Sequence, residues 1–227
     1  MIETYDCVPP PLCRLRGARV MPGWLQDSKV LEKFEPSLGK KEEADAKQFA
    51  EASLALISVF DLITGMGMAS ADMSGNANTL LKAANANPGS TLKSLIDAEC
   101  AGKDAAALKK IAGDGKTVSC ALLWLARALN FIIKMLEELI ANPGKKLSDC
   151  VLAGYEVSLK PHHGMMIRTT FSVGVKAAPY RDAFVAKLGP SEEEVFGAIK
   201  GKQADMSELV KSVQGYLKTK DPTIFAD

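Results

Sequence analysis

One stretch of this chain, residues 117–141, is apolar on nearly every side and limits the folds that the rest of the chain can adopt. A helix that is hydrophobic all round has to be buried, so the stretch predicts a central helix surrounded by other elements. Arg127, Asn130 and Lys134 interrupt the apolar run before the turn at 142–144. We therefore read it as a core helix and expect no membrane span.

Helical spacing continues on both sides of this stretch. Phe49, Leu56 and Phe60 recur at intervals of seven and four residues, the repeat of an amphipathic helix. Glycines and prolines separate successive segments, and no segment of useful length alternates with period two, so we expect no strands. The expected helices are residues 41–63, 71–86, 91–100, 104–111, 117–141, 146–160, 163–177, 180–188, one that begins at 190, and 205–218.

These helices are expected to form one all-α domain over residues 23–227, because no linker inside it is long enough to separate two domains. Residues 1–22 are expected to form an extended N-terminal leader, since Pro9, Pro10 and Pro11 oppose a helix there. The leader lacks the apolar segment of a signal peptide and carries Glu3 and Asp6.

Charge and cysteine content narrow the kinds of partner. The 28 basic and 27 acidic residues leave a net charge of +1, which gives no electrostatic reason to expect nucleic acid. Five cysteines without close repeated spacing indicate reduced thiols and a cytoplasmic protein. The two histidines are adjacent and no cysteine pair has ligand spacing, so we expect no metal and no cofactor. We expect a monomer.

Asp72 and Asn76 are the most informative polar pair. They are four residues apart in a segment predicted to begin a helix with Ser70 as its N-cap, so their side chains share one face. A carboxylate beside a carboxamide suits a ligand rich in hydroxyls and amides. An Asp at a helix start usually serves only the helix dipole, and Asn76 could simply face solvent. The pair alone does not establish a site.

Trp124 and His163 are further candidates with equally plain structural explanations. A tryptophan in a central helix is by default a core residue whose indole N–H needs a partner, and His162 with His163 could be a surface pair. A hydrolase that pairs His163 with Asp72 stays open at this point. No Gly-x-Ser-x-Gly elbow or glycine-rich phosphate loop is present, and we assign no catalytic residue.

Taken in order, four separated motifs resemble the glycolipid transfer protein family. They are ADMSGN at 71–76, ALLWLARALNF at 121–131, LKPHHG at 159–164 and AAPY at 177–180, and the resemblance covers about residues 49–188. It implies an all-α, single-domain, two-layer helical sandwich. Members of this family carry glycosphingolipids between membranes without hydrolysing them. The resemblance therefore implies a non-enzymatic carrier with a glycolipid ligand and transient contact with a membrane surface.

The resemblance also implies a role for each candidate residue. Asp72 would accept a hydrogen bond from the lipid amide N–H, and His163 would donate one to the amide C=O. Asn76 would bind sugar hydroxyls, and Trp124 would lie flat under the sugar ring. Arg127 is a possible secondary contact that belongs to the pattern of both sugar-binding and phosphate-binding members.

Two positions depart from the family pattern. The family usually has a lysine seven residues after the aspartate, where this chain has Thr79 and carries Lys82 one turn further on. This weakens the expected grip on the sugar or changes the preferred sugar, and Thr79 stays a possible secondary contact. The family's membrane-contacting tryptophan, two residues after the histidine, is Met165 here, which predicts weak and transient docking.

A carrier of this kind must replace the bilayer around the lipid tails. Tens of methylenes at about 0.8 kcal/mol each amount to something on the order of 20 kcal/mol, so the cavity has to be dry and apolar. Flexible methionines suit a cavity that is filled and emptied. The expected lining, which could equally be ordinary core, is Phe49, Leu56, Phe60, Leu122, Phe131, Ile132, Met135, Leu136, Met165, Met166 and Phe171.

Several alternatives remain. Superfamily members that bind ceramide-1-phosphate tend to have a lysine where Asn76 stands and an arginine near the position of Trp124, so these two residues favour a neutral sugar. Transfer of ceramide-1-phosphate or another sphingolipid, and a lipid sensor, are alternatives within the same fold. A lipid hydrolase and a helical module that binds a protein partner are more distant alternatives.

Overall fold

The computed structural model describes residues 23–226, and the expected leader at 1–22 lies outside them. The described residues form no strand, and Asp45 and Thr91 make an isolated antiparallel bridge. The all-α prediction is confirmed. The α-helices are α1 (Trp24–Ser28), α2 (Val30–Phe34), α3 (Ala46–Ile57), α4 (Gly67–Ala86), α5 (Leu92–Cys100), α6 (Ala105–Gly113), α7 (Val118–Ala141), α8 (Leu147–Glu156), α9 (Met165–Val175), α10 (Arg181–Leu188) and α11 (Glu192–Lys218). Short 3-10 segments are η1 (Glu35–Ser37), η2 (Lys41–Glu43), η3 (Ser58–Leu62) and η4 (Lys160–His162).

Helix α7 is the buried centre of the fold, as its apolar sequence predicts. Its first turn is held by the Glu99 carboxylate of α5, which accepts the backbone N–H groups of Val118 at 2.9 Å and Ser119 at 2.7 Å. An acidic group at this end also complements the helix dipole. By length and composition alone α7 could cross a membrane, despite its interruptions. However, 78% of its apolar window is buried inside the fold, as in a core helix.

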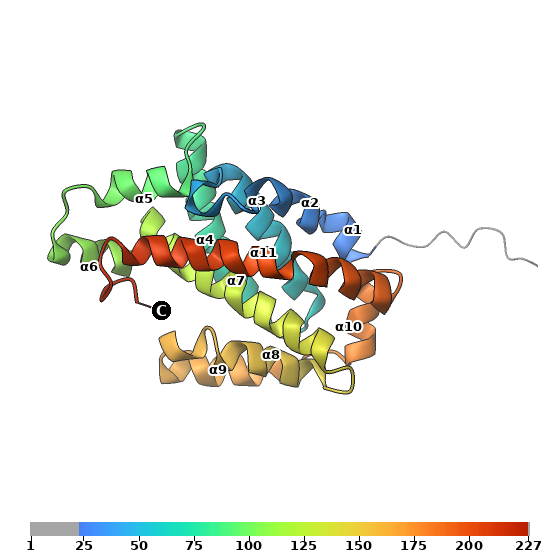
Figure 1. The fold of residues 1–227 in the computed structure, drawn as a ribbon. Coiled ribbons are helices and arrows are strands. Elements are labelled where there is room, and N and C mark those ends of the chain that lie inside the picture. Colours follow the sequence, from blue (N-terminus) through green and yellow to red (C-terminus); the bar gives the residue numbers. More distant parts are fainter. Residues whose placement is uncertain (1–22, 227) are drawn as a thin grey trace, which may run out of the picture.

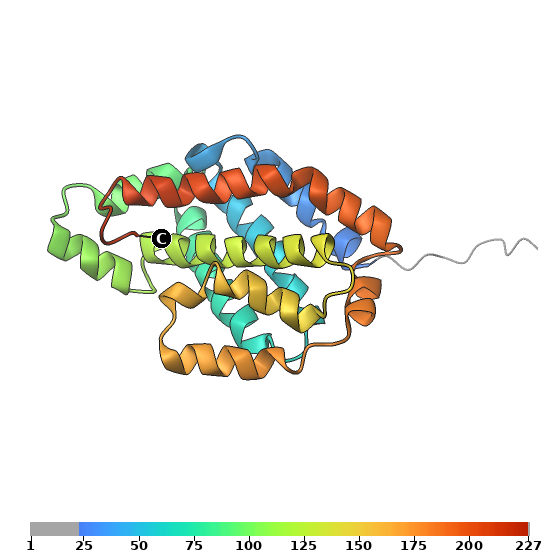
Figure 2. The same ribbon diagram turned by 60° about the horizontal axis from the view of Figure 1, so that its bottom comes forward.

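The helices pack as the expected two-layer sandwich, which is confirmed. In Figures 1 and 2, α7 lies between α11 and α8, while α2, α3 and α4 form the layer behind. Helix α9 follows the outer side of α8 at the edge of the molecule. Because α4 packs directly against α7, the helix that carries Asp72 and the helix that carries Trp124 are neighbours.

Glycines allow the backbone of two pairs of segments to approach each other closely. A Cβ atom on Gly154 of α8 would lie 2.7 Å from the backbone nitrogen of Met135, so α8 packs backbone against α7. Gly65 has a φ of +90°, and a Cβ there would lie 2.1 Å from the carbonyl oxygen of Gly174 at the end of α9. The turn before α4 and the end of α9 are therefore pressed together.

The start of α4 differs from the prediction. The helix begins at Gly67, and Ser70 lies within it, where its backbone N–H donates to the Met66 carbonyl at 2.9 Å. Two closely spaced glycines suggested a longer break than the chain makes. As a result Asp72 lies beyond the first turn of α4, where a helix dipole offers it little stabilisation.

Other boundaries also moved. The last two predicted helices are one helix, α11, because Gly197 and Gly201 face open space and do not interrupt it. The predicted helix 41–63 is divided, since α3 begins only after Asp45, whose carboxylate caps the Gln48 N–H. Helix α8 ends at Glu156, earlier than predicted. Helices α1 and α2 were not predicted individually, because each has five residues, too few to show a clear period.

Candidate functional site

Trp124 and His163 face each other, although they are far apart in the chain. Trp124 is half-buried on α7, and His163 lies in the turn between η4 and α9. Their rings stack with centroids 5.7 Å apart and an interplanar angle of 22°. His162 approaches the same indole edge-on, with centroids 6.4 Å apart. Trp124 also packs against the hydrophobic core, so the core explanation and the pairing with the histidines both apply to it.

Arg127 lies one turn beyond Trp124 on α7 and is buried. Its guanidinium carbon is 4.9 Å from the centre of the Trp124 ring, within cation–π range. Its Nη2 donates to the carbonyl oxygen of Ala226 at 2.7 Å, so the end of the chain also reaches the site. A sugar ring can pack on the indole only where His163 and Arg127 leave it exposed.

Tyr155 is a member of the site to which the sequence analysis gave no role. Its hydroxyl oxygen lies 3.0 Å from Nδ1 of His163, and it is buried on α8. Burial raises the pKa of Tyr155, so the hydroxyl keeps its proton near neutral pH. The signal that could have found it is its position, eight residues before His163, with the end of α8 and the short segment η4 between them.

Burial also controls the protonation of His163. Desolvation lowers its pKa below 6.5, the negative charge of Asp72 opposes that shift, and the positive charges of Arg168 and Arg127 add to it. The imidazole is therefore neutral at pH 7, with one nitrogen that donates and one that accepts. Arg168 also fixes the turn, since its Nε donates to the His163 carbonyl oxygen at 2.7 Å.

Asp72 and Asn76 share a face of α4, as their spacing predicts. The Asn76 amide donates to the Asp72 carbonyl oxygen at 3.2 Å, and Asp72 is exposed. The negative charge of Asp72 acts on His163, where it opposes the lowering of the pKa. Thr79 is half-buried, and its hydroxyl donates to the Gly75 carbonyl oxygen of its own helix at 3.0 Å. Lys82 is exposed on α4.

Aromatic rings connect this cluster to the core. Tyr155 stacks on Phe171 with centroids 3.8 Å apart, Phe171 meets Phe131 edge-on at 5.7 Å, and Phe131 stacks on Phe60 at 5.4 Å. The route leads from the half-buried imidazole of His163 to fully buried phenyl rings. Polar groups at the surface are therefore continuous with an apolar interior.

Most of the side chains expected to line an apolar cavity are buried, but three, all on α9, are not. Met165 and Met166 are 84% and 82% exposed at the start of α9, so they are not part of the core. Phe171 is half-buried on the same helix. The remaining residues of that set are buried: Phe49, Leu56, Phe60, Leu122, Phe131, Ile132, Met135 and Leu136.

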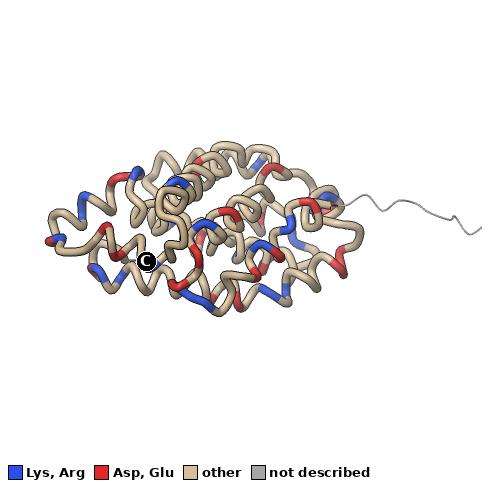
Figure 3. Tube along the Cα trace, turned by 90° about the horizontal axis from the view of Figure 1, so that it is seen from above, with Lys and Arg blue, Asp and Glu red and all other residues tan. Residues whose placement is uncertain are grey.

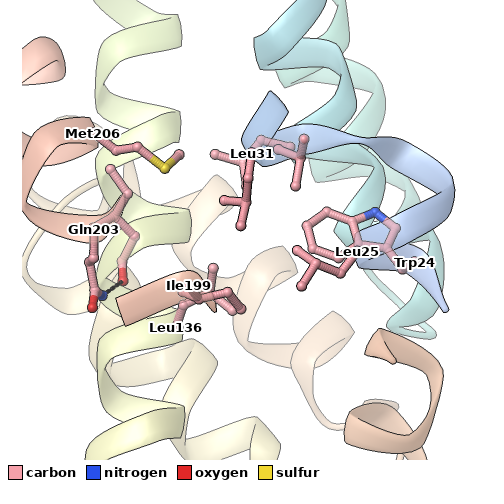
Figure 4. Close-up of a pocket in the computed structure, with 10 residues that line it drawn as sticks. Trp24, Leu25, Leu31, Leu136, Ile199, Gln203 and Met206 are labelled. Atoms are coloured by element: carbon pink, nitrogen blue, oxygen red, sulfur yellow. Dashed lines mark hydrogen bonds between the residues drawn. The ribbon is translucent and has the colours of Figure 1, made fainter. Parts of the chain in front are cut away.

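Figure 4 shows a small apolar cavity further along α7. It has a volume of about 20 Å³ and lies between residues of α1, α2, α3, α7 and α11, among them Trp24, Leu31 and Met206. That is room for about one water molecule, far less than an alkyl chain occupies. This cavity as it stands is therefore too small to hold a lipid tail.

Among residues 23–226, no group of three or more His, Cys, Asp or Glu side chains is placed to hold a metal ion. Cys100, Cys120 and Cys150 are free and buried, and burial raises the thiol pKa of Cys120 and Cys150. These two thiols stay protonated at neutral pH and act as packing residues. Cys7 and Cys13 lie outside the described residues.

Comparison with known proteins gives a consistent picture. Residues 44–190 match the family model for glycolipid transfer protein. A glycolipid transfer protein of Aureobasidium melanogenum is 32% identical over 178 residues, which cover 77% of this chain and 83% of that protein. The mouse pleckstrin homology domain-containing family A member 8 is 34% identical over 105 residues, and this match spans 44% of the chain but only 20% of that protein.

Solved structures share the fold. The crystal structure of a fungal glycolipid transfer protein superposes with a TM-score of 0.69 at 26% identity, covering 83% of this chain and 96% of that one. A variant of the Arabidopsis accelerated-cell-death protein in complex with ceramide-1-phosphate superposes with a TM-score of 0.75 at 21% identity, covering 90% and 98%. At that identity, the second likeness shows the fold alone.

Proposed function

The chain belongs to the glycolipid transfer protein family, and on that premise we propose that it carries a glycosphingolipid between membranes without changing it chemically. The observation that supports this most is the cluster of Trp124, His163 and Tyr155, which continues into the aromatic rings of the core and lies partly on α7, the helix against which α4 packs. A lipid with a sugar, an amide and two tails presents its groups in that same order, from polar to apolar.

The ceramide amide would be bound from two sides. We assign Asp72 to the amide N–H and His163 to the amide C=O, with Asn76 on sugar hydroxyls and Trp124 under the sugar ring. The contact between Tyr155 and Nδ1 supports this assignment, because a protonated hydroxyl that donates to Nδ1 places the imidazole proton on the other nitrogen, Nε2. That nitrogen is then a donor for a carbonyl oxygen. Thr79 and Arg127 are secondary contacts.

The same geometry supports a carrier over a hydrolase. In a hydrolytic triad the imidazole nitrogen remote from the nucleophile bonds to a carboxylate, whereas Nδ1 of His163 lies against a tyrosine hydroxyl. We therefore assign no catalytic role to His163 or Asp72. Two guanidinium groups near the imidazole, Arg127 and Arg168, make ceramide-1-phosphate the second candidate ligand, because arginine binds phosphate well.

Helix α9 is the proposed membrane-contacting surface. Met165, Met166 and Ile167 are more than half exposed at its start, and Val173 is 61% exposed further along. Of its residues only Val175 is buried, so the helix presents apolar side chains to the outside. Apolar side chains without an aromatic anchor support weak, reversible docking. Positive and negative residues are mixed along the described chain (Figure 3), in keeping with contact that needs no strongly anionic surface.

We propose that the protein acts as a monomer in the cytoplasm.

A vesicle-to-vesicle transfer assay tests the headgroup assignment. It compares fluorescent galactosylceramide, glucosylceramide and ceramide-1-phosphate, using the wild type, Asp72→Val and the control Asp205→Val. Asp205 is an exposed aspartate inside α11, away from the site. Leaving the lipid amide N–H unpaired should cost roughly 1–3 kcal/mol, so Asp72→Val should bind glycosylceramide about 5–150-fold more weakly. The control should transfer like the wild type.

Three outcomes of this assay are informative. Equal transfer by the wild type and Asp72→Val would refute the headgroup site. A preference for ceramide-1-phosphate over both sugar lipids would favour the second candidate. Release of a fatty acid or free sugar from labelled lipid, followed by chromatography, would show an enzyme instead of a carrier.

A further inference from the structure

We propose that Met165 and Met166 form an oxidation-sensitive site, at which conversion of the two thioethers to sulfoxides weakens the docking of α9 on a membrane. The inference rests on the proposed membrane-contacting surface of the carrier and deepens it, because it names a chemical modification that controls that surface. A sulfoxide is polar but uncharged, so it changes how the side chain fits an apolar environment and leaves the charge of the helix unchanged.

The fold divides its methionines into two groups. Met68, Met165 and Met166 are 74%, 84% and 82% exposed. The other methionines among residues 23–226 are at most 7% exposed, and they are Met66, Met73, Met135 and Met206. No methionine in this range has an intermediate exposure. A dissolved oxidant has to touch the sulfur, so it reaches the first group while the core keeps its thioethers unmodified.

The cysteines of the described chain are protected from the same oxidant. Cys100, Cys120 and Cys150 are buried, and burial raises the thiol pKa of Cys120 and Cys150. A peroxide reacts with the thiolate, which these two groups do not form near neutral pH. Within residues 23–226, the sulfur atoms most open to oxidation are therefore the exposed thioethers.

The two α9 methionines supply much of the apolar surface that this helix presents to the outside. Four large apolar side chains of α9 are more than half exposed, and they are Met165, Met166, Ile167 and Val173. Oxidation of both methionines therefore makes half of these side chains polar. Because neither methionine belongs to the buried interior, the change removes apolar contact with a bilayer and leaves the packing of the core intact.

The reaction consumes one molecule of a peroxide for each methionine. The thioether sulfur attacks one peroxide oxygen, the O–O bond breaks, and an S–O bond forms. The sulfur is oxidised by two electrons, hydrogen peroxide is reduced by two electrons, and its other oxygen leaves as water. A methionine sulfoxide reductase reverses the change, because two thiols supply two electrons and two protons, the oxygen leaves as water, and the thiols join as a disulfide. The modification is therefore reversible.

The test measures vesicle binding and glucosylceramide transfer before and after treatment with dilute hydrogen peroxide, and peptide mass spectrometry locates the sulfoxides. Each protein is compared with its own untreated sample. In the wild type, Met165 and Met166 should oxidise before the buried Met73 and Met135, and both measurements should fall about tenfold. Methionine sulfoxide reductase with a thiol should restore them. In Met165→Leu/Met166→Leu, whose side chains are apolar but lack sulfur, peroxide should change neither measurement.

Met68→Leu is the matched control. Met68 is also exposed but lies on α4, so this variant should lose vesicle binding after peroxide as the wild type does. Protection by Met68→Leu would overturn the inference, and so would an equal loss in the double leucine variant. Undiminished vesicle binding by wild type that carries sulfoxides at both α9 methionines would overturn it as well.

Further results separate this inference from the proposed function. Untreated wild type that binds vesicles but transfers no glycolipid would overturn the proposed function, and the effect of peroxide on vesicle binding would still decide the inference. Untreated wild type that binds no vesicles would overturn the inference itself, because α9 would have no docking to lose. Binding of a short-chain glycolipid dispersed in water should be the same before and after peroxide. A loss of that binding would place the damage in the lipid site and overturn the inference.

Discussion

At the scale of single residues, the site depends on a neutral histidine. His163 is kept neutral because it is partly withdrawn from water, and the charge of Asp72 does not outweigh that effect on its pKa. Tyr155, whose raised pKa keeps its hydroxyl protonated, lies 3.0 Å from Nδ1 of His163 and holds the ring in place. The pKa shifts of His163 and Tyr155 cannot be read from the sequence of either residue, because both shifts arise from burial in the fold.

The histidine makes stability depend on pH in a defined direction. The pKa of His163 is lower in the folded chain than its ordinary value of 6.5, so the unfolded chain takes up the proton first as the pH falls. The free energy of unfolding should therefore decrease between pH 6.5 and the lower folded-state pKa. Urea unfolding of the wild type and His163→Gln across this range measures the effect. The difference between the two should shrink on acidification, and a constant difference would contradict the assignment.

At the scale of elements, α8 can pack closely against α7 only because residue 154 is a glycine and has no side chain. Alanine at Gly154 would bring Cβ to 2.7 Å from the Met135 nitrogen and 3.1 Å from the Phe131 carbonyl oxygen. Backbone atoms cannot move aside as a side chain can. We expect Gly154→Ala to lower the free energy of unfolding by about 1–3 kcal/mol, measured by chemical denaturation.

Gly197→Ala provides the comparison. Gly197 lies inside α11 and faces open space, so alanine there should raise the free energy of unfolding by roughly 0.5–1 kcal/mol. Opposite signs for the two substitutions would confirm the close packing of α8 on α7. If Gly154→Ala were as stable as Gly197→Ala, the two helices would have to be further apart.

Helix α9 is an element whose exposed face contributes little to the core. Replacing Met165 and Met166 together by serine should slow transfer between vesicles by about tenfold, the equivalent of roughly 1.4 kcal/mol of lost apolar contact. Binding of a short-chain glycolipid that is dispersed in water should stay unchanged, because neither side chain belongs to the buried interior. Weakening of both activities together would place these methionines in the lipid site instead.

At the scale of the whole molecule, the C-terminal end of the described chain meets the candidate site. The last described residues fold back along α7: Phe225 is fully buried, and Ala226 accepts a hydrogen bond from Arg127. The segment is anchored just before, where Lys220 and Tyr216 both bond to the Asp97 carboxylate of α5. The position of Arg127 beside Trp124 thus depends on residues about 100 positions later.

Removal of the buried Phe225 side chain should change the surroundings of Trp124. Phe225→Ala should lower the free energy of unfolding by about 3–5 kcal/mol, because it empties a fully buried site. It should also shift tryptophan emission to longer wavelength as water reaches the loosened ring. Ile224→Ala, at a half-buried neighbour, should destabilise less and leave the emission in place. Unchanged emission from a destabilised Phe225→Ala would show that the chain end stabilises the fold without shaping the site.

Much of the helical framework was predictable because it follows from local patterns. The apolar character of residues 117–141 indicated the buried position of α7, and the threonine before it provides its N-cap. Boundaries at single glycines were less predictable. The glycine at 67 begins a helix and those at 197 and 201 lie inside one, since a glycine ends a helix only when its neighbours also stop it.

The sequence by itself determined the helix content, the central helix and, through its four family motifs, the candidate residues Asp72, Asn76, Trp124 and His163. The helices follow from a period of 3.6 residues and the candidate residues from the order of the motifs, and both patterns can be read along the chain. Only the tertiary structure decided that Tyr155 contacts His163, that Arg127 bonds to the chain end, and that Trp24 lines an apolar cavity. These are contacts between distant segments, and no local pattern encodes which side chains meet when helices pack.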